Sequence, residues 1–150
     1  MICVQEHPFE PAALLAAFSH PDGGACASFV GRVRGGGVMQ LVLEHYPGFT
    51  EAEIARIEAE AHARFDLIDT LIVHRHGAMR PGETIVLTAA LARHRKDALA
   101  AVDYLMDRLK TEAPFWKREI TPAGEAWIEP RAEDYAAAAA WERTMGEEKA

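Results

Sequence analysis

Two lysines, Lys110 and Lys117, stand on either side of a short apolar segment, 114–116, and are well suited to do chemistry. Between Leu91 and Arg118 there are seven basic and four acidic residues, although the whole chain has a formal net charge of −7. Two ammonium groups held close together, or one desolvated beside aromatic rings, bind protons less tightly than usual. Such a lysine exchanges protons with a reacting group, and its charged form stabilises an oxyanion. We therefore expect an anion site in this segment.

A second basic group precedes three glycines. Arg32 and Arg34 flank Val33, and strand alternation sends both arginines to the same face. Glycines at 35–37 allow a backbone to approach a ligand closely, and the guanidinium fork matches the geometry of a phosphate. A hairpin with two exposed arginines explains the same residues equally well, so both interpretations stay open.

A third basic group is the pair His94 and Arg95, between a predicted strand and the start of a predicted helix. Other cations of the region are expected to be ordinary surface residues. Lys96 and Arg108 lie on a helix whose opposite face is apolar, so we expect both side chains to be solvated.

Several kinds of chemistry lack support. His74 and His76 are separated by one residue without a nearby cluster of cysteines or carboxylates, which is a weak metal signal. The glycines at 35–37 lack the Lys-Ser/Thr or strand-to-helix context of nucleotide-binding loops. We therefore expect no metal and no cofactor. Cys3 and Cys26 have no zinc-type spacing, and we expect both to be buried thiols.

The composition fits one domain spanning residues 1–150, with 49% hydrophobic residues to form a core. The net negative charge argues against general attraction to nucleic acid or to an anionic membrane. No segment approaches the roughly 20 apolar residues of a membrane span, and the N-terminal residues lack a basic segment followed by an apolar run. These features predict a cytoplasmic protein.

The first half of the chain predicts a helix, a hairpin and a second helix. Pro11 begins the first helix, which extends to Phe18. Segments 25–33 and 39–46 read as two strands of a hairpin across the glycines. The sequence of 50–53 has the form of a capping box, with Thr50 as the cap and Glu53 as its partner. The following helix should direct these residues towards the core: Ile54, Ile57, Ala61 and Phe65.

The second half predicts central strands at 71–73 and 84–87 and then a helix that ends near Lys110. One apolar stripe of that helix comprises Ala98, Val102, Leu105 and Leu109. Pro114 prevents the helix from continuing. We expect Phe115 and Trp116 to anchor the next strand in the core. Strands at 115–121 and 125–128 and a helix at 133–145 complete an α+β fold with mixed hairpins and helices.

Five motifs in this order resemble the large, catalytic subunit of molybdopterin synthase. They are SFVGRVR (28–34), LEHYPGFTE (43–51), VHRHGAMRPGE (73–83), ARHRKDA (92–98) and LKTEAPFWKRE (109–119). The resemblance extends from about Gly24 to Arg131. It implies an α/β-hammerhead-like fold and sulfur transfer to cyclic pyranopterin monophosphate (precursor Z), which forms the dithiolene of molybdopterin. It also implies a homodimer within a heterotetramer, whose small ubiquitin-like subunit carries the sulfur as a Gly-Gly thiocarboxylate, and it requires no metal or nucleotide for the transfer.

The resemblance also implies roles for individual residues. The two essential lysines of the family match Lys110 and Lys117, and we expect Lys110 to polarise the thiocarboxylate while Lys117 assists proton transfer or holds the pterin. The substrate-binding residues of the family match Arg32, Val33, Arg34, His94, Arg95, Lys110, Lys117, Arg118, Glu119 and Arg131. The resemblance implies that the neighbouring chain contributes some of them, with His94, Arg95 and Arg131 as the candidates.

Two positions depart from the family pattern. The glycine segment 35–37 is shorter than the family's Asp- or Asn-bearing loop, and Phe49 stands where Met is usual. Two alternative functions remain: a non-catalytic module that grips a phosphorylated ligand or a peptide tail, and an RNA-binding protein with an extended basic face and exposed aromatic residues.

Overall fold

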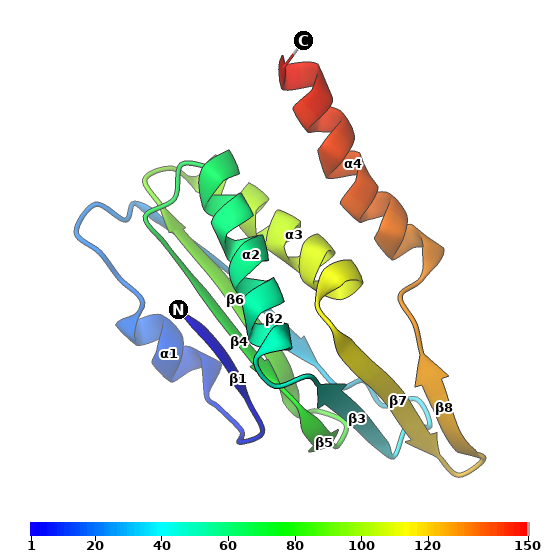
Figure 1. The fold of residues 1–150 in the computed structure, drawn as a ribbon. Coiled ribbons are helices and arrows are strands. Elements are labelled where there is room, and N and C mark those ends of the chain that lie inside the picture. Colours follow the sequence, from blue (N-terminus) through cyan, green and yellow to red (C-terminus); the bar gives the residue numbers. More distant parts are fainter. Residues whose placement is uncertain (150) are drawn as a thin grey trace.

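The computed structural model describes residues 1–149 of the 150-residue chain and contains two four-stranded sheets with helices packed around them (Figure 1). The strands are β1 (Ile2–Gln5), β2 (Ala25–Arg32), β3 (Gln40–His45), β4 (Asp69–Arg75), β5 (Gly77–Met79), β6 (Thr84–Ala92), β7 (Phe115–Thr121) and β8 (Gly124–Ile128). The helices are α1 (Pro11–Ala17), α2 (Phe49–Arg64), α3 (Arg95–Glu112) and α4 (Ala132–Lys149). The mixture confirms the predicted α+β class.

The first sheet has the strand order β1-β4-β6-β2, so strands far apart in the sequence lie side by side. β4 is parallel to β1 and antiparallel to β6. β2 runs antiparallel to β6 along the edge of the sheet, with Ala25 opposite Ala92 and Val30 opposite Leu87.

The predicted hairpin between segments 25–33 and 39–46 is wrong. β2 pairs with β6 in the first sheet, whereas β3 pairs with β5 and β7 in the second. Ala27 packs β2 against Ala101 of α3, a long-range contact that local turn signals do not predict. The glycines at 35–37 therefore link two sheets.

α2 and α3 cover one face of the first sheet and α1 packs on the other (Figure 1). The apolar stripes predicted for α2 and α3 are confirmed, because these side chains are buried: Ile54, Ile57, Ala61, Ala98, Val102, Leu105 and Leu109. The partly buried Phe65 packs against the same cluster. On the opposite face, Leu14 and Leu15 of α1 pack against Leu71 and Leu87.

The start of α2 differs from the predicted capping box. Gly48, with a φ of 84°, precedes the helix, and the left-handed region of its backbone favours glycine. The carboxylate of Glu51, not that of Glu53, accepts a hydrogen bond from the Gly48 N–H at 2.6 Å. Thr50 is buried, and its hydroxyl donates to the Pro114 carbonyl oxygen at 3.1 Å, which ties α2 to the start of β7.

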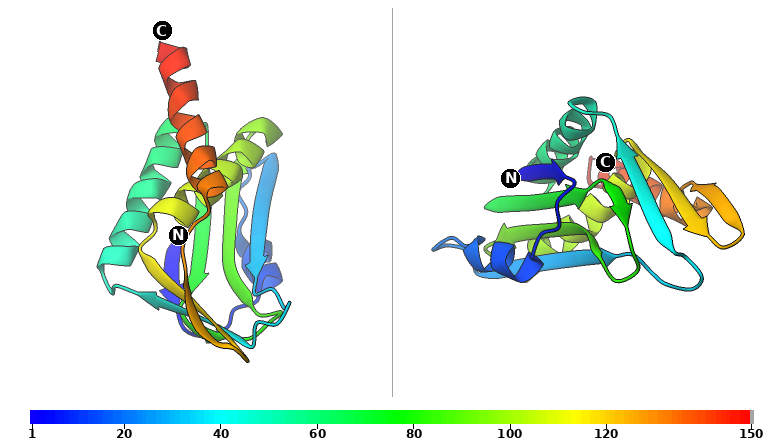
Figure 2. Two further views of the ribbon diagram at one scale, coloured as in Figure 1. Left: turned by 90° about the vertical axis from the view of Figure 1, so that its right-hand side faces the viewer. Right: turned by 90° about the horizontal axis from the view of Figure 1, so that it is seen from below.

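The second sheet has the order β5-β3-β7-β8 and lies beside the first at an angle to it (Figure 2). α4 follows β8, packs along α3 and projects beyond the rest of the molecule at its C-terminal end (Figure 2). Trp141 anchors it: its indole N–H donates to Asp107 of α3 at 2.8 Å, and its ring lies edge-on to Phe65 and Tyr104.

Arg108, Cys26 and Cys3 are buried or exposed differently from the prediction. Arg108 is 9% exposed rather than solvated, because it forms ion pairs with Glu60 and Glu112 at 2.8 and 3.1 Å. Cys26 is exposed because β2 is an edge strand, and Cys3 is only partly buried. Among the described residues, no helix is long and apolar enough to span a membrane.

Candidate functional site

Lys110 and Lys117 line one pocket. The pocket has a volume of about 540 Å³ and lies between the end of α3, the face of β7 and the segment that joins β8 to α4. Its size is in the range of a small-molecule site. The predicted meeting of the two lysines is therefore seen in the geometry, although their catalytic role stays a prediction.

The break between α3 and β7 sets the direction of both lysines. α3 ends at Glu112, and Pro114 separates it from β7, as predicted. Alternation along β7 then directs Phe115 and Lys117 towards the pocket and Trp116 away from it. Trp116 is 53% exposed, so the prediction that it anchors the strand in the core is wrong, and Phe115 alone does so.

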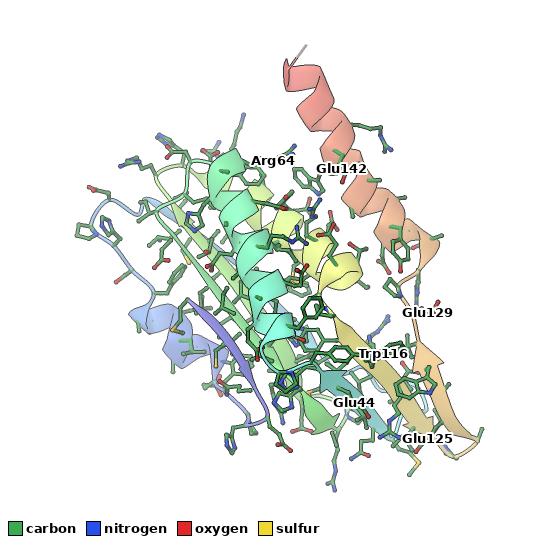
Figure 3. The ribbon with its side chains drawn as sticks, viewed as in Figure 1. Glu44, Arg64, Trp116, Glu125, Glu129 and Glu142 are labelled. Carbon is green, nitrogen blue, oxygen red and sulfur yellow. The ribbon has the colours of Figure 1, made fainter. Side chains whose placement is uncertain are left out.

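The outer face of the second sheet carries exposed aromatic rings. Trp116 and Trp127 lie edge-on to each other with ring centroids 6.0 Å apart. Glu44 lines the shallow hollow beside them, and Figure 3 shows Glu44 and Trp116 on this part of the molecule. A face that carries these aromatic rings and the Glu44 carboxylate is not the extended basic face that RNA binding requires.

The two lysines have different electrostatic environments. The Lys110 ammonium is 3.4 Å from Oδ1 of Asp134, and its side chain is 55% exposed. Lys117 is more enclosed: burial lowers its pKa below the usual range, and the charge of Lys110 lowers it further. The Glu119 carboxylate acts in the opposite direction. Lys117 therefore gives up its proton more readily than an ordinary lysine.

Asp134 belongs to the first turn of α4, and its carboxylate interacts with a backbone N–H and with an ammonium group. Its Oδ2 accepts a hydrogen bond from the Arg131 N–H at 2.8 Å, while Oδ1 faces Lys110. The N–H of Arg131 and the ammonium of Lys110 both hold the pKa of Asp134 below its usual range. Asp134 is thus the carboxylate partner of Lys110 in this structure.

Arg34, Glu119 and Arg131 also line the pocket, as the sequence predicts. Arg34 and Arg131 come from opposite ends of the chain, so the fold places two guanidinium groups around the same space as the lysines. Together these side chains form a site for an anionic ligand with an apolar interior.

Arg32 and Val33 lie next to the pocket without lining it. Arg32 is exposed at the end of β2, and the Val33 side chain is buried. The backbone of Val33 is held at both polar atoms, since its N–H donates to Glu83 at 2.9 Å and its carbonyl accepts from Gly82 at 2.8 Å. Val33 thus fixes the segment that carries Arg34.

Arg118, His94 and Arg95 lie outside this pocket in the same chain. Arg118 alternates to the outer face of β7, where it pairs with Glu125 at 2.9 Å. His94 and Arg95 lie at the start of the 18-residue α3, about 22 Å along the helix from Lys110. Their roles as substrate-binding residues stay predictions, which for His94 and Arg95 require a neighbouring chain.

Three polar pocket residues were missed by the sequence reasoning: His74, Glu129 and Asp134. Asp134 follows Arg131 at the spacing of a capping box, and that spacing was the available signal. His74 was weighed only as a metal ligand, yet it lines the pocket. No group of three metal-ligating side chains is present among the side chains that the structure describes, those of residues 1–143.

Comparison with known proteins decides the family. Residues 4–112 match the model of a protein family described as MoaE protein. The chain belongs to the MoaE family. The match ends at Glu112, so it includes Lys110 but not Lys117.

Individual proteins similar to this chain match it over nearly its whole length. A molybdopterin synthase catalytic subunit from Caulobacter vibrioides is 47% identical over 147 residues, which is 95% of this chain and 98% of the relative. A solved MoaE protein from Burkholderia ambifaria is 48% identical to this chain, with a TM-score of 0.83. The similarity covers 94% of this chain and 97% of that protein.

A solved structure from Helicobacter pylori resembles the MoaE fold described here. It is a protein-protein complex of subunits 1 and 2 of molybdopterin-converting factor. The TM-score is 0.73 over 87% of this chain and 91% of that chain. At 20% identity, this similarity shows the fold alone.

Proposed function

We propose that this chain is the catalytic subunit of a molybdopterin synthase. It transfers sulfur from the C-terminal thiocarboxylate of a small ubiquitin-like carrier to cyclic pyranopterin monophosphate (precursor Z) and so forms the dithiolene of molybdopterin. The observation that carries the proposal is that Lys110, Lys117, Arg34 and Arg131, distant in sequence, line one pocket. The molybdopterin synthase catalytic subunit of Caulobacter vibrioides, 47% identical over 95% of this chain, supports it.

The two lysines take different roles in this proposal. Lys110, charged and 55% exposed, receives the negatively charged tail of the carrier and polarises its carbonyl group. The incoming thiocarboxylate competes with Asp134 for the same ammonium. Once the sulfur is bonded to the substrate, water attacks the carbonyl carbon of the carrier's acyl group, and the C–S bond breaks. The sulfur leaves as a thiolate on the substrate, the carrier ends as a carboxylate, and Lys117 in its neutral form accepts a proton of that water.

The phosphate end of the substrate lies against the guanidinium groups of Arg34 and Arg131. Arginine is suited to this task because its planar fork donates two parallel hydrogen bonds to phosphate oxygens. Glu119 raises the proton affinity of Lys117, so the same wall of the pocket both binds the substrate and adjusts the base.

The assembly and location are part of the same proposal. Residues 1–150 act as one domain, two copies form a homodimer, and each binds a small carrier subunit to give a heterotetramer. The Helicobacter pylori complex shows that a protein with this fold occurs together with a second subunit. The two free cysteines suit the reducing cytoplasm.

A reconstituted reaction with Lys110→Ala tests the proposal. Removing the ammonium eliminates the group that polarises the carbonyl, so we expect molybdopterin formation from precursor Z and thiocarboxylated carrier to fall at least about 100-fold. Arg80→Ala is the control, because Arg80 is an exposed cation outside the pocket and its loss should leave the rate unchanged. A Lys110→Ala protein with a near wild-type rate would favour the non-catalytic binding module.

A further inference from the structure

His74 is a polar side chain in an apolar part of the pocket wall. It lies near the end of β4 on the same face as Ile72, which is fully buried. Its ring is stacked on Phe115, with centroids 4.0 Å apart and an interplanar angle of 17°. Met106 and Leu109 of α3 line the same pocket. The imidazole is therefore held in place by the first sheet, the second sheet and the core.

The hydrogen bonds of His74 define its tautomer. Nδ1 is 2.8 Å from the Arg75 carbonyl oxygen, and a carbonyl oxygen only accepts, so Nδ1 carries the hydrogen. Nε2 then has a free lone pair, and no hydrogen bond to it is found among the described residues. Burial lowers the pKa of His74 to about 4, and the charge of Lys117 acts in the same direction. His74 therefore presents an uncharged acceptor at neutral pH.

Nε2 has no protein partner and faces a pocket, so a ligand that fills the pocket takes the place of water at this acceptor. The ligand must then supply a donor, because an acceptor that loses water without gaining a new partner costs free energy. The cations Lys110, Arg34 and Arg131 attract the anionic part of a ligand. Next to His74 and Phe115, the ligand needs a different kind of group, namely a flat and largely apolar ring that carries an N–H donor. A phosphorylated heterocycle with ring N–H groups satisfies both requirements.

We propose that His74 is a substrate-binding residue whose Nε2 accepts a hydrogen bond from a ring N–H of the pterin. This inference rests on the proposed function and adds an orientation to it. The ring system lies against Phe115 and Met106, and the phosphate lies against Arg34 and Arg131. His74 thus selects for a heterocycle that carries a donor at this position.

Variants of His74 test the inference in the reconstituted enzyme with saturating carrier. His74→Phe keeps an aromatic ring for stacking but removes the acceptor, and we expect the KM for precursor Z to rise about tenfold with kcat within about twofold. His74→Gln, which places an amide oxygen near the position of Nε2, should restore most of the loss. His76→Phe is the matched control, because His76 stacks on His45 and does not line the pocket.

A spectroscopic measurement covers the case in which His74→Phe does not fold. In the wild-type protein labelled with ¹⁵N-histidine, the unprotonated Nε2 resonance of His74 should shift when precursor Z is added. Inorganic phosphate alone, which binds the cations, should leave it in place. An Nε2 resonance that precursor Z does not move, or a His74→Phe protein with wild-type KM, overturns the inference.

The outcomes separate this inference from the proposed function. A wild-type protein that makes no molybdopterin from precursor Z and thiocarboxylated carrier contradicts the proposed function. A wild-type protein that makes molybdopterin, together with an unchanged KM in His74→Phe, contradicts only the role of His74.

Discussion

At the scale of single residues, the pocket uses two lysines in different states. Lys110 is paired with Asp134 and exposed, whereas Lys117 is enclosed and faces the positive charges of Lys110 and Arg34. Adjacent like charges and burial both disfavour the charged form of an amine. This arrangement suits the proposed roles, in which Lys110 binds the carrier tail and Lys117 takes part in proton transfer.

The depressed pKa of Lys117 predicts a stability effect with a definite sign. The folded protein binds this proton less tightly than the unfolded chain, so stability rises with pH between the lowered pKa and the usual value near 10.5. Lys117→Met removes the enclosed charge and should raise the Tm at pH 7 by about 3 °C.

Thermal unfolding of both proteins from pH 7 to pH 10 checks this prediction. The advantage of Lys117→Met should shrink as the pH rises, because the wild-type lysine loses its proton in the folded state. A variant that is less stable than wild type at pH 7, or an advantage that grows with pH, would show that Lys117 is not held in an unfavourable charged form.

At the scale of elements, α4 forms one wall of the pocket, so the packing of this helix affects the site. Arg131 and Asp134 lie at its start, and Figure 3 shows Glu129 in the connection that leads to it from β8. About ten residues further along, Trp141 packs against α2 and α3, and Arg64 lies over its ring at 5.1 Å. The helix is thereby held at a point remote from the chemistry.

Trp141→Ala should release α4 without unfolding the sheets. The loss of the indole contacts and of the hydrogen bond to Asp107 weakens docking by about 2 kcal/mol, because Trp141 is only partly buried. Hydrogen exchange of the α4 amides should become faster, and the KM for precursor Z should rise about tenfold as Arg131 loses its position.

Tyr135→Ala serves as the comparison for this experiment, since Tyr135 is on the same helix and 52% exposed. It should leave both exchange and KM near the wild-type values. If Trp141→Ala accelerates exchange in α4 while the KM stays the same, α4 is not a functional wall of the pocket.

At the scale of the whole molecule, five of the predicted substrate-binding residues do not line the pocket of one chain: Arg32 and Val33 lie beside it, and the other three lie away from it. His94 and Arg95 lie at the far end of α3, and Arg118 faces the outer side of the second sheet. The proposed homodimer accounts for His94 and Arg95, because a second copy can bring its own α3 start to this pocket. Arg118 forms an ion pair with Glu125, and the proposed homodimer does not explain its predicted role in substrate binding.

Mixed dimers test the contribution of a second chain. A Lys110→Ala protein and a His94→Ala/Arg95→Ala protein should each be inactive or nearly so in reconstitution. If the pocket combines residues from both copies, a mixed dimer of the two variants contains one intact site, and dissociation and mixing should restore up to about a quarter of the wild-type activity. The same mixture without recovered activity would place all the required residues within one chain.

Much of this architecture follows from local patterns in the chain. The stripes of α2 and α3, the end of α3 at Pro114 and the strands on either side of Gly124 are all readable because period and backbone restriction are properties of neighbouring residues. The basic segment around Lys110 and Lys117 is readable for the same reason. These patterns suffice to single out Lys110 and Lys117 as candidates for the chemistry.

Long-range packing decided the rest. β2 pairs with β6 because Ala27 fits against α3, which local turn signals at the glycines misrepresent. Phe115 and Lys117 point to the face of β7 that lines the pocket. Because side chains alternate along a strand, Trp116 and Arg118 face outwards. His74 is neutral and forms one hydrogen bond within the protein because β4 and the ring of Phe115 enclose its imidazole. Burial, and with it the proton affinity of a side chain, is a property of the folded surroundings rather than of neighbouring residues in the chain.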